Sequence, residues 1–169
     1  MNKPLKAEII KKQLIASDPM NNNEYFISLW GEGRTRFSNL LTHLKEEELP
    51  KTLAPSPNSA GFIIRHIGDV ELLFAKNVFK LDGIQVHAKT LIDQKDSGEW
   101  TNLEELIAYN QKAHDSLRAA ILAQDDKAWE EFITTKEFGT KTKAEALGRI
   151  ISHTAYHGGQ LAIILKYGH

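Results

Sequence analysis

Four long segments of this chain carry apolar residues at steps of three and four, which is the spacing of an α-helix that buries one face. The segments cover approximately residues 23–48, 58–77, 101–121 and 142–167. Four amphipathic helices of this length can bury their apolar faces only against one another. The pattern therefore predicts an all-α fold, a four-helix bundle.

Polar residues in the order that caps helices mark where three of these segments begin. The pair at 58–59, Asn and Ser, offers side-chain oxygens to the first free backbone N–H groups of the second helix. Thr101 with Glu104 and Thr142 with Glu145 both match the capping box. We expect the third helix to begin at Thr101 and the fourth at Thr142.

The connections between the helices differ in length. About ten residues join the first helix to the second, whereas about twenty separate each later pair. Such long connections are unusual between simple antiparallel neighbours, so we expect at least one crossover connection. A short helical turn is expected within residues 125–132. The whole chain, residues 1–169, is expected to form a single domain, with residues 1–20 as an N-terminal arm.

Composition excludes several classes of site and partner. The chain has no Cys, which excludes disulfides, thiolate metal sites and a cysteine nucleophile. Any metal must then be held by nitrogen and oxygen atoms. The 21 Lys and Arg residues balance 22 Asp and Glu residues, so charge gives no reason to expect nucleic acid or an anionic membrane as a partner.

Two further observations concern location. No apolar run approaches the roughly 18 residues of a membrane-spanning helix. The first twenty residues have no apolar core of the kind a signal peptide needs, because charged residues interrupt them: Lys3, Lys6, Glu8, Lys11 and Lys12. We therefore expect a cytoplasmic protein.

Three histidines occupy positions that should face the core. His153 and His157 are four residues apart in the last helix, so they lie on the same side of it. His66 lies between Ile63 and Val70 on the inward side of the second helix. Buried imidazoles need polar partners to offset desolvation, and one divalent cation would satisfy all three.

A second interpretation of the histidines stays open, namely that each is an ordinary core residue bonded to a carbonyl or a tyrosine. We expect this of His114 in the third helix. His43, His87 and His169 are assigned no role. Other catalytic motifs are absent from the sequence: it has no His-Glu-x-x-His, no Glu-x-x-His, no phosphate-binding glycine loop and no Gly-x-Ser-x-Gly.

Two segments carry a resemblance to a known family. Residues 59–71, SAGFIIRHIGDVE, and residues 153–161, HTAYHGGQL, resemble the second-helix and last-helix motifs of the DinB-like (damage-inducible) family of metalloenzymes. Helix order and length are similar over essentially the whole chain. The resemblance implies a four-helix bundle with a crossover and a metal held by His66, His153 and His157. It also implies a homodimer.

Three neutral imidazoles without a fourth protein ligand leave coordination positions open, as in catalytic sites. We therefore expect one divalent ion, nickel or zinc first and iron or manganese as alternatives. The predicted function is metal-dependent hydrolysis of a small molecule. Two alternatives stay open: a transferase of a small thiol cofactor, as the resemblance suggests, and a non-catalytic metal-binding protein associated with stress. Asp69 and Gln160 are placed either to support the ligands or to serve as ordinary polar groups.

Overall fold

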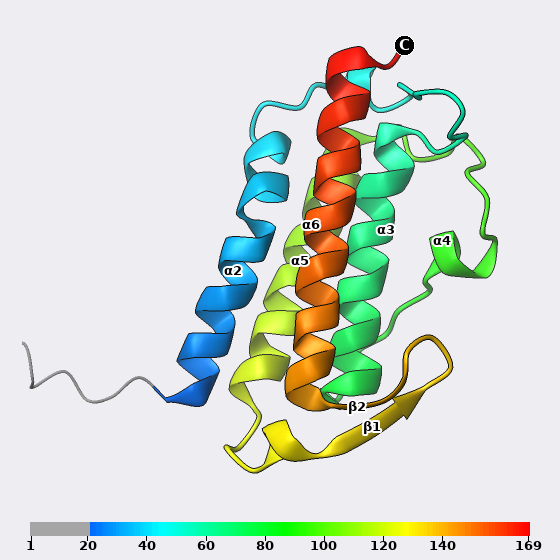
Figure 1. The fold of residues 1–169 in the computed structure, drawn as a ribbon. Helices are drawn as coiled ribbons and strands as arrows, with labels where there is room; N and C mark the ends of the chain where they lie inside the picture. Colours follow the sequence, from blue (N-terminus) through cyan, green and yellow to red (C-terminus); the bar gives the residue numbers. More distant parts are fainter. Residues whose placement is uncertain (1–20) are drawn as a thin grey trace, which may run out of the picture.

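The computed structural model describes residues 21–169, so the predicted N-terminal arm lies outside the described residues. Four long helices lie side by side along one axis (Figure 1), which confirms the all-α bundle. Their bounds are Asn22–Leu41 for α2, Ala60–Leu73 for α3, Leu103–Leu122 for α5 and Lys143–Tyr167 for α6. None of the helices in this described part is long and apolar enough to cross a membrane.

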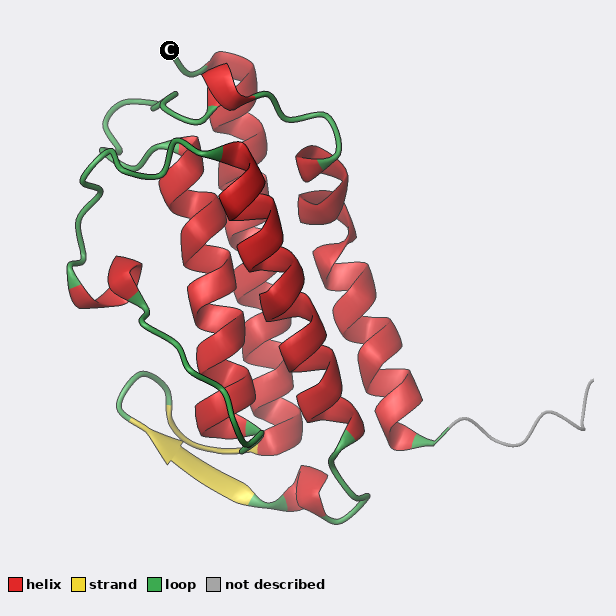
Figure 2. Cartoon of the chain, turned by 180° about the vertical axis from the view of Figure 1, so that it is seen from behind, coloured by secondary structure: helices red, strands yellow, loops and turns green. Residues whose placement is uncertain are grey.

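The smaller elements lie in the connections (Figure 2). They are the 3₁₀ turns Glu46–Glu48 and Ala128–Glu130, the π turn Phe74–Val78, the short helix α4 (Lys89–Ile92), and the strands β1 (Phe132–Thr135) and β2 (Gly139–Thr142). The turn at 128–130 confirms the helical turn expected between residues 125 and 132. The two strands form an antiparallel hairpin that the sequence analysis did not predict.

One connection crosses the full length of the bundle. Helices α3 and α5 run in the same direction, and the segment between them returns along the outside of the bundle, carrying α4 on the way (Figure 1). The other two connections each join helices that meet at one end. The predicted crossover is therefore present, and it is the connection from α3 to α5.

The predicted N-caps are correct for α6 and wrong by one residue for α5. Thr142 and Glu145 form the predicted capping box at the start of α6. At α5, however, Asn102 rather than Thr101 is the N-cap, and its side chain accepts a hydrogen bond from the Glu105 backbone N–H. Both candidate caps are polar and adjacent, so the sequence pattern fits either register.

The first helix ends earlier than predicted, at Leu41 instead of near residue 48. Leu44 and Leu49 are buried, which extends the apolar spacing past the true end of the helix. The backbone at Lys45 is nevertheless extended, and residues 46–48 form a separate 3₁₀ turn. The apolar spacing therefore continues beyond the end of the helix, which is why the sequence predicted a longer helix.

The core consists of two groups of buried side chains, one toward each end of the bundle. The group at the hairpin end includes Trp30, Val70 and Ile150, and the group at the other end includes Ile63 and Leu161. The inward faces of α3 and α6 pass from one group to the other. The buried face of α5 includes Leu106 and Ala113, whereas Ile107 is exposed.

The crossover segment is fastened to the beginning of α3. Gly61 lies so close to the backbone of Trp100 that a Cβ at this glycine would be only 1.9 Å from the Trp100 carbonyl oxygen. The Ser59 backbone N–H donates to Asp96 at 2.7 Å. The Arg65 guanidinium lies over the ring of Trp100, 4.8 Å from its centroid. These contacts fix where α4 lies relative to α3.

Candidate metal centre

The three predicted histidines come together between α3 and α6. His66 is on α3, and His153 and His157 are one turn apart on α6. All three side chains are half-buried, and one ring nitrogen from each lies within 4.8 Å of the others. The ring centroids are 4.5–5.0 Å apart: 5.0 Å for His66 and His153, 4.7 Å for His66 and His157, and 4.5 Å for His153 and His157.

A close contact joins the Nε2 atoms of His66 and His153, which are 3.1 Å apart. Nitrogen ligands that lie about 2.0–2.1 Å from a tetrahedral ion are about 3.3 Å from each other. The observed separation is close to that value. The donor set and its spacing therefore fit a divalent ion.

A hydrogen-bonded chain sets the tautomer of His66. The Thr90 hydroxyl donates to Asp69 Oδ2 at 2.8 Å, so its oxygen is left to accept a proton from His66 Nδ1, 3.1 Å away. With the proton on Nδ1, the lone pair of the neutral ring is on Nε2, which points toward His153. Outer partners of this kind orient histidine ligands in metal sites.

Asp69 is the last residue in this series of hydrogen bonds, and its side chain is completely buried. Its carboxylate accepts hydrogen bonds from Arg65 Nε at 2.9 Å, from the Tyr109 hydroxyl at 2.6 Å and from the Thr90 backbone N–H at 3.1 Å. Burial raises the pKa of Tyr109, and the hydrogen bond to Asp69 raises it further, so the phenol keeps its proton and remains a donor. Asp69 thus holds α4 and its Thr90 beside His66.

His157 has a partner of its own. Its Nδ1 lies 2.7 Å from the amide oxygen of Gln160, and the amide nitrogen of Gln160 donates to the Tyr156 hydroxyl at 3.0 Å. An amide oxygen only accepts, so Nδ1 carries the proton and Nε2 carries the lone pair. His153 differs, because its buried Nδ1 has no hydrogen-bond partner within residues 21–169.

All three rings are neutral at pH 7. Burial lowers the pKa of His66 to about 4, with a smaller lowering from His157 and an opposing effect of Asp69. The pKa of His153 is lowered to about 3, mainly by burial. The two neighbouring histidines and the positive charge of Arg149 lower it by smaller amounts. Burial also lowers the pKa of His157. A metal ion would therefore displace no proton from these rings near neutrality.

Two pockets are each lined by two of the three histidines. The hairpin pocket has a volume of about 420 Å³ and is lined by Val70, Phe74, Glu137, Arg149, Ser152, His153, Tyr156 and His157. The loop pocket has a volume of about 340 Å³ and is lined by Asn58, Phe62, Ile63, His66, Thr90, Leu91, Gln94 and His157. His157 lines both pockets, so the histidine group is accessible from two directions.

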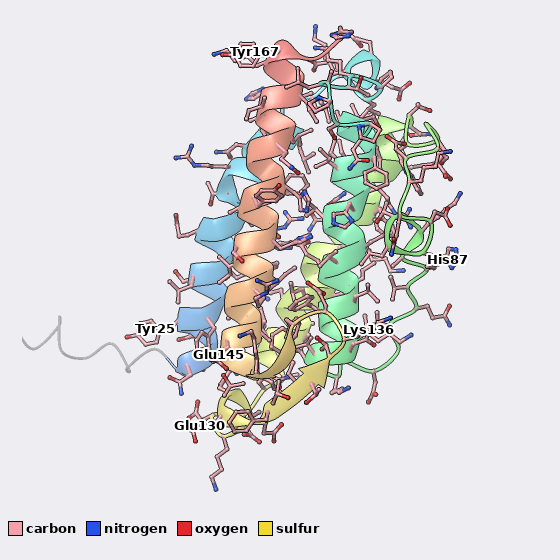
Figure 3. All side chains as sticks on the ribbon, turned by 45° about the vertical axis from the view of Figure 1, so that its right-hand side comes forward. Tyr25, His87, Glu130, Lys136, Glu145 and Tyr167 are labelled. Atoms are coloured by element: carbon pink, nitrogen blue, oxygen red, sulfur yellow. The ribbon has the colours of Figure 1, made fainter. Side chains whose placement is uncertain are left out.

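The remaining histidines do not join this group. His114 is half-buried, stacks on Trp30 with ring centroids 4.9 Å apart, and bonds through Nδ1 to Asp115 at 2.9 Å. Its partner is therefore a carboxylate, not the carbonyl or tyrosine that was expected. His43 is exposed beyond the end of α2, and His87 is exposed on the crossover segment (Figure 3).

Thr90 and Glu137 also belong to the site, and neither was predicted from the sequence. Asp69 and Gln160 were candidates because each follows a ligand candidate by three residues. Thr90 has no such spacing signal, since it lies within a long connection whose path depends on tertiary contacts. Glu137 reaches the site because of the hairpin, whose sequence signal is the β-branched run Ile133 to Thr135 followed by Gly139.

A sequence profile described as the DinB superfamily matches residues 29–161 of the chain. The chain belongs to the DinB superfamily. All three histidines fall inside the matched region. A search of curated proteins found no match.

Solved structures also resemble this fold. A crystal structure of the mycothiol-dependent maleylpyruvate isomerase is 18% identical with a TM-score of 0.63, and a point mutant of that isomerase is 17% identical with a TM-score of 0.60. Each match covers 82% of this chain but only 60% of the other chain. At this level of identity, the similarity is one of fold.

Proposed function

We propose that this protein is a mononuclear metal-dependent enzyme that acts on a small molecule. The observation that carries the proposal is the convergence of three neutral imidazoles beside two pockets that share His157 as a lining residue. His66, His153 and His157 would hold the ion. Imidazole suits nickel and zinc first, with iron and manganese as alternatives.

A divalent ion at this position would act as a Lewis acid that makes a water or a thiol deprotonate near neutral pH. The protein contributes orientation and a partly dry environment. Thr90 and Gln160 hold two of the rings with Nε2 free, and Asp69 fixes Thr90. Val70 and Phe74 give one pocket an apolar wall.

A thiol-dependent transfer fits the site better than hydrolysis, which the sequence analysis placed first. Hydrolysis needs one organic substrate and water, whereas the site has two pockets that both include His157. Two pockets suit a reaction between a small thiol and a second small molecule. The structural neighbour is by name a mycothiol-dependent isomerase, which supports the use of a small thiol by analogy of fold.

Cobalt-substituted protein tests this proposal. We expect N-acetylcysteine to produce a near-ultraviolet charge-transfer band that its S-methyl derivative does not produce, because only a free thiol supplies a thiolate. The H153A/H157A double variant should give no band. If the wild type binds cobalt but the thiol produces no band, the thiol proposal is wrong and hydrolysis becomes the leading reaction.

A thermal melt with and without a chelator tests the non-catalytic alternative. Two groups of buried apolar side chains already hold the bundle together. We therefore expect only a modest decrease in Tm when metal is removed. A large decrease in Tm, together with no turnover of any tested substrate, would indicate that the metal serves only to stabilise the fold. The cytoplasmic location and the homodimer stay predictions.

A further inference from the structure

We propose that the hairpin pocket binds a carboxylate-bearing small molecule, and that the carboxylate pairs with Arg149 in place of Glu137. This inference rests on the proposed function, because His153 and His157 line the same pocket. It adds a substrate class, a small organic acid, and a residue that recognises it. It also gives the hairpin a role in the site.

The spacing along α6 sets the size of the molecule. Arg149, His153 and His157 follow one another at steps of four residues and all line the pocket. One step of four residues advances about 6 Å along a helix. A molecule of a few carbon atoms can therefore place one end on Arg149 and the other end beside the histidines.

Arg149 is held only loosely by its present partner. One of its terminal nitrogens, Nη2, lies 3.9 Å from Glu137 Oε1, which is longer than a hydrogen bond, and the two side chains are 50% and 57% exposed. Exposed ion pairs of this kind contribute little to stability. A guanidinium offers two parallel N–H groups to a carboxylate, so a substrate can make a better pair than Glu137 does.

The other walls of the pocket fit the same kind of molecule. Val70 and Phe74 provide apolar surface for a short carbon chain. The Tyr156 hydroxyl accepts a hydrogen bond from Gln160 at 3.0 Å, which leaves its own proton free to be donated. Glu137 follows Lys136 at the tip of the hairpin, and Figure 3 shows that this tip lies beside the bundle.

Calorimetric titration with succinate and with the uncharged succinamide tests the proposal, using metal-free and zinc-loaded protein. We expect succinate to bind both forms and succinamide to bind neither measurably. R149Q should weaken succinate binding about 10- to 100-fold, the usual worth of a hydrogen bond to a charged group. E137Q should strengthen it by up to about fivefold, because it removes a competing carboxylate.

R36Q is the matched control, since Arg36 is an exposed arginine on α2 outside the pocket. It should leave succinate binding unchanged. No binding of succinate, equal binding of succinamide, or binding that R149Q leaves intact would overturn the carboxylate site. Zinc content of the same samples separates the two proposals: Arg149-dependent binding by protein that takes up no zinc would refute the metal centre alone.

Discussion

The Nε2 atoms of His66 and His153 lie 3.1 Å apart, although 87 positions separate the two residues in the sequence. Thr90 accepts the Nδ1 proton of His66, so the lone pair of this ring points at the second ring. Both rings are neutral because burial keeps their pKa values low. A cation shared between them would use both nitrogens, and His157 lies where it can supply a third.

Thr90→Val is expected to weaken zinc binding about 10- to 100-fold, which is the usual effect of losing an outer partner of a histidine ligand. The variant removes the hydroxyl, which accepts from His66 and donates to Asp69, but keeps the backbone N–H that donates to Asp69. The fold should therefore remain intact. Competition with a chelator of known affinity measures the change.

Two variants control this experiment. Thr90→Ser keeps a hydroxyl at the same place and should restore most of the affinity. Thr35→Val removes an exposed hydroxyl that bonds to the carbonyl oxygen of Gly31, and it should have no effect on zinc binding. If Thr90→Val binds zinc as tightly as the wild type, the hydrogen bond to His66 does not orient the ligand.

Gly61→Ala is expected to lower the free energy of unfolding by about 1–3 kcal/mol, the cost of overpacking. The added Cβ would lie 1.9 Å from the Trp100 carbonyl oxygen, so the crossover segment must move. Gly31→Ala is the matched variant, because no neighbouring atom of residues 21–169 lies within 4 Å of its Cβ position in α2. It should raise stability by up to about 1 kcal/mol.

Urea denaturation of both glycine variants measures these changes. Equal effects of the two substitutions would show that Gly61 is not needed for close contact with the crossover segment. A second readout is zinc affinity. It should fall in Gly61→Ala, because the displaced segment carries Thr90, and should stay unchanged in Gly31→Ala.

The stability of the metal-free protein is expected to depend on pH through the buried histidines. Their folded-state pKa values, about 4 for His66 and about 3 for His153, lie below the ordinary value of 6.5. As pH falls below about 6.5, the unfolded chain binds protons that the folded chain does not. The free energy of unfolding should therefore be highest above pH 6.5 and fall steadily toward pH 4.

Urea denaturation between pH 7.5 and pH 5, about the range in which histidines of the unfolded chain titrate, measures this slope in the presence of a chelator. His153→Gln should reduce the slope because it removes one of the buried rings. His87→Gln should keep it, since His87 is exposed on the crossover segment. A wild-type slope that His153→Gln leaves unchanged would contradict the assignment of the pH dependence to the buried group.

The bundle and the position of the three histidines follow from local spacing, which is why they were predictable. Apolar steps of three and four place His66, His153 and His157 on inward faces whatever the path of the loops. The same spacing misled the prediction at the end of α2, where Leu44 and Leu49 are buried outside the helix.

The residues that complete the site depend on tertiary contacts, and local spacing does not reveal them. Thr90 reaches His66 only because Gly61 and Asp96 hold the crossover segment against α3. Glu137 reaches Arg149 only because a hairpin forms before α6. A short β-branched run beside a glycine is a weak signal in a chain that is otherwise helical.

Elemental analysis of protein purified without a metal-affinity tag tests the central claim most directly, with a His153→Ala/His157→Ala double variant beside the wild type. We predict about one equivalent of a divalent metal, nickel or zinc first, in the wild type and none in the variant. His87→Ala should bind as much metal as the wild type. A folded wild type that contains no metal and takes up none from added zinc or nickel would contradict the metal centre.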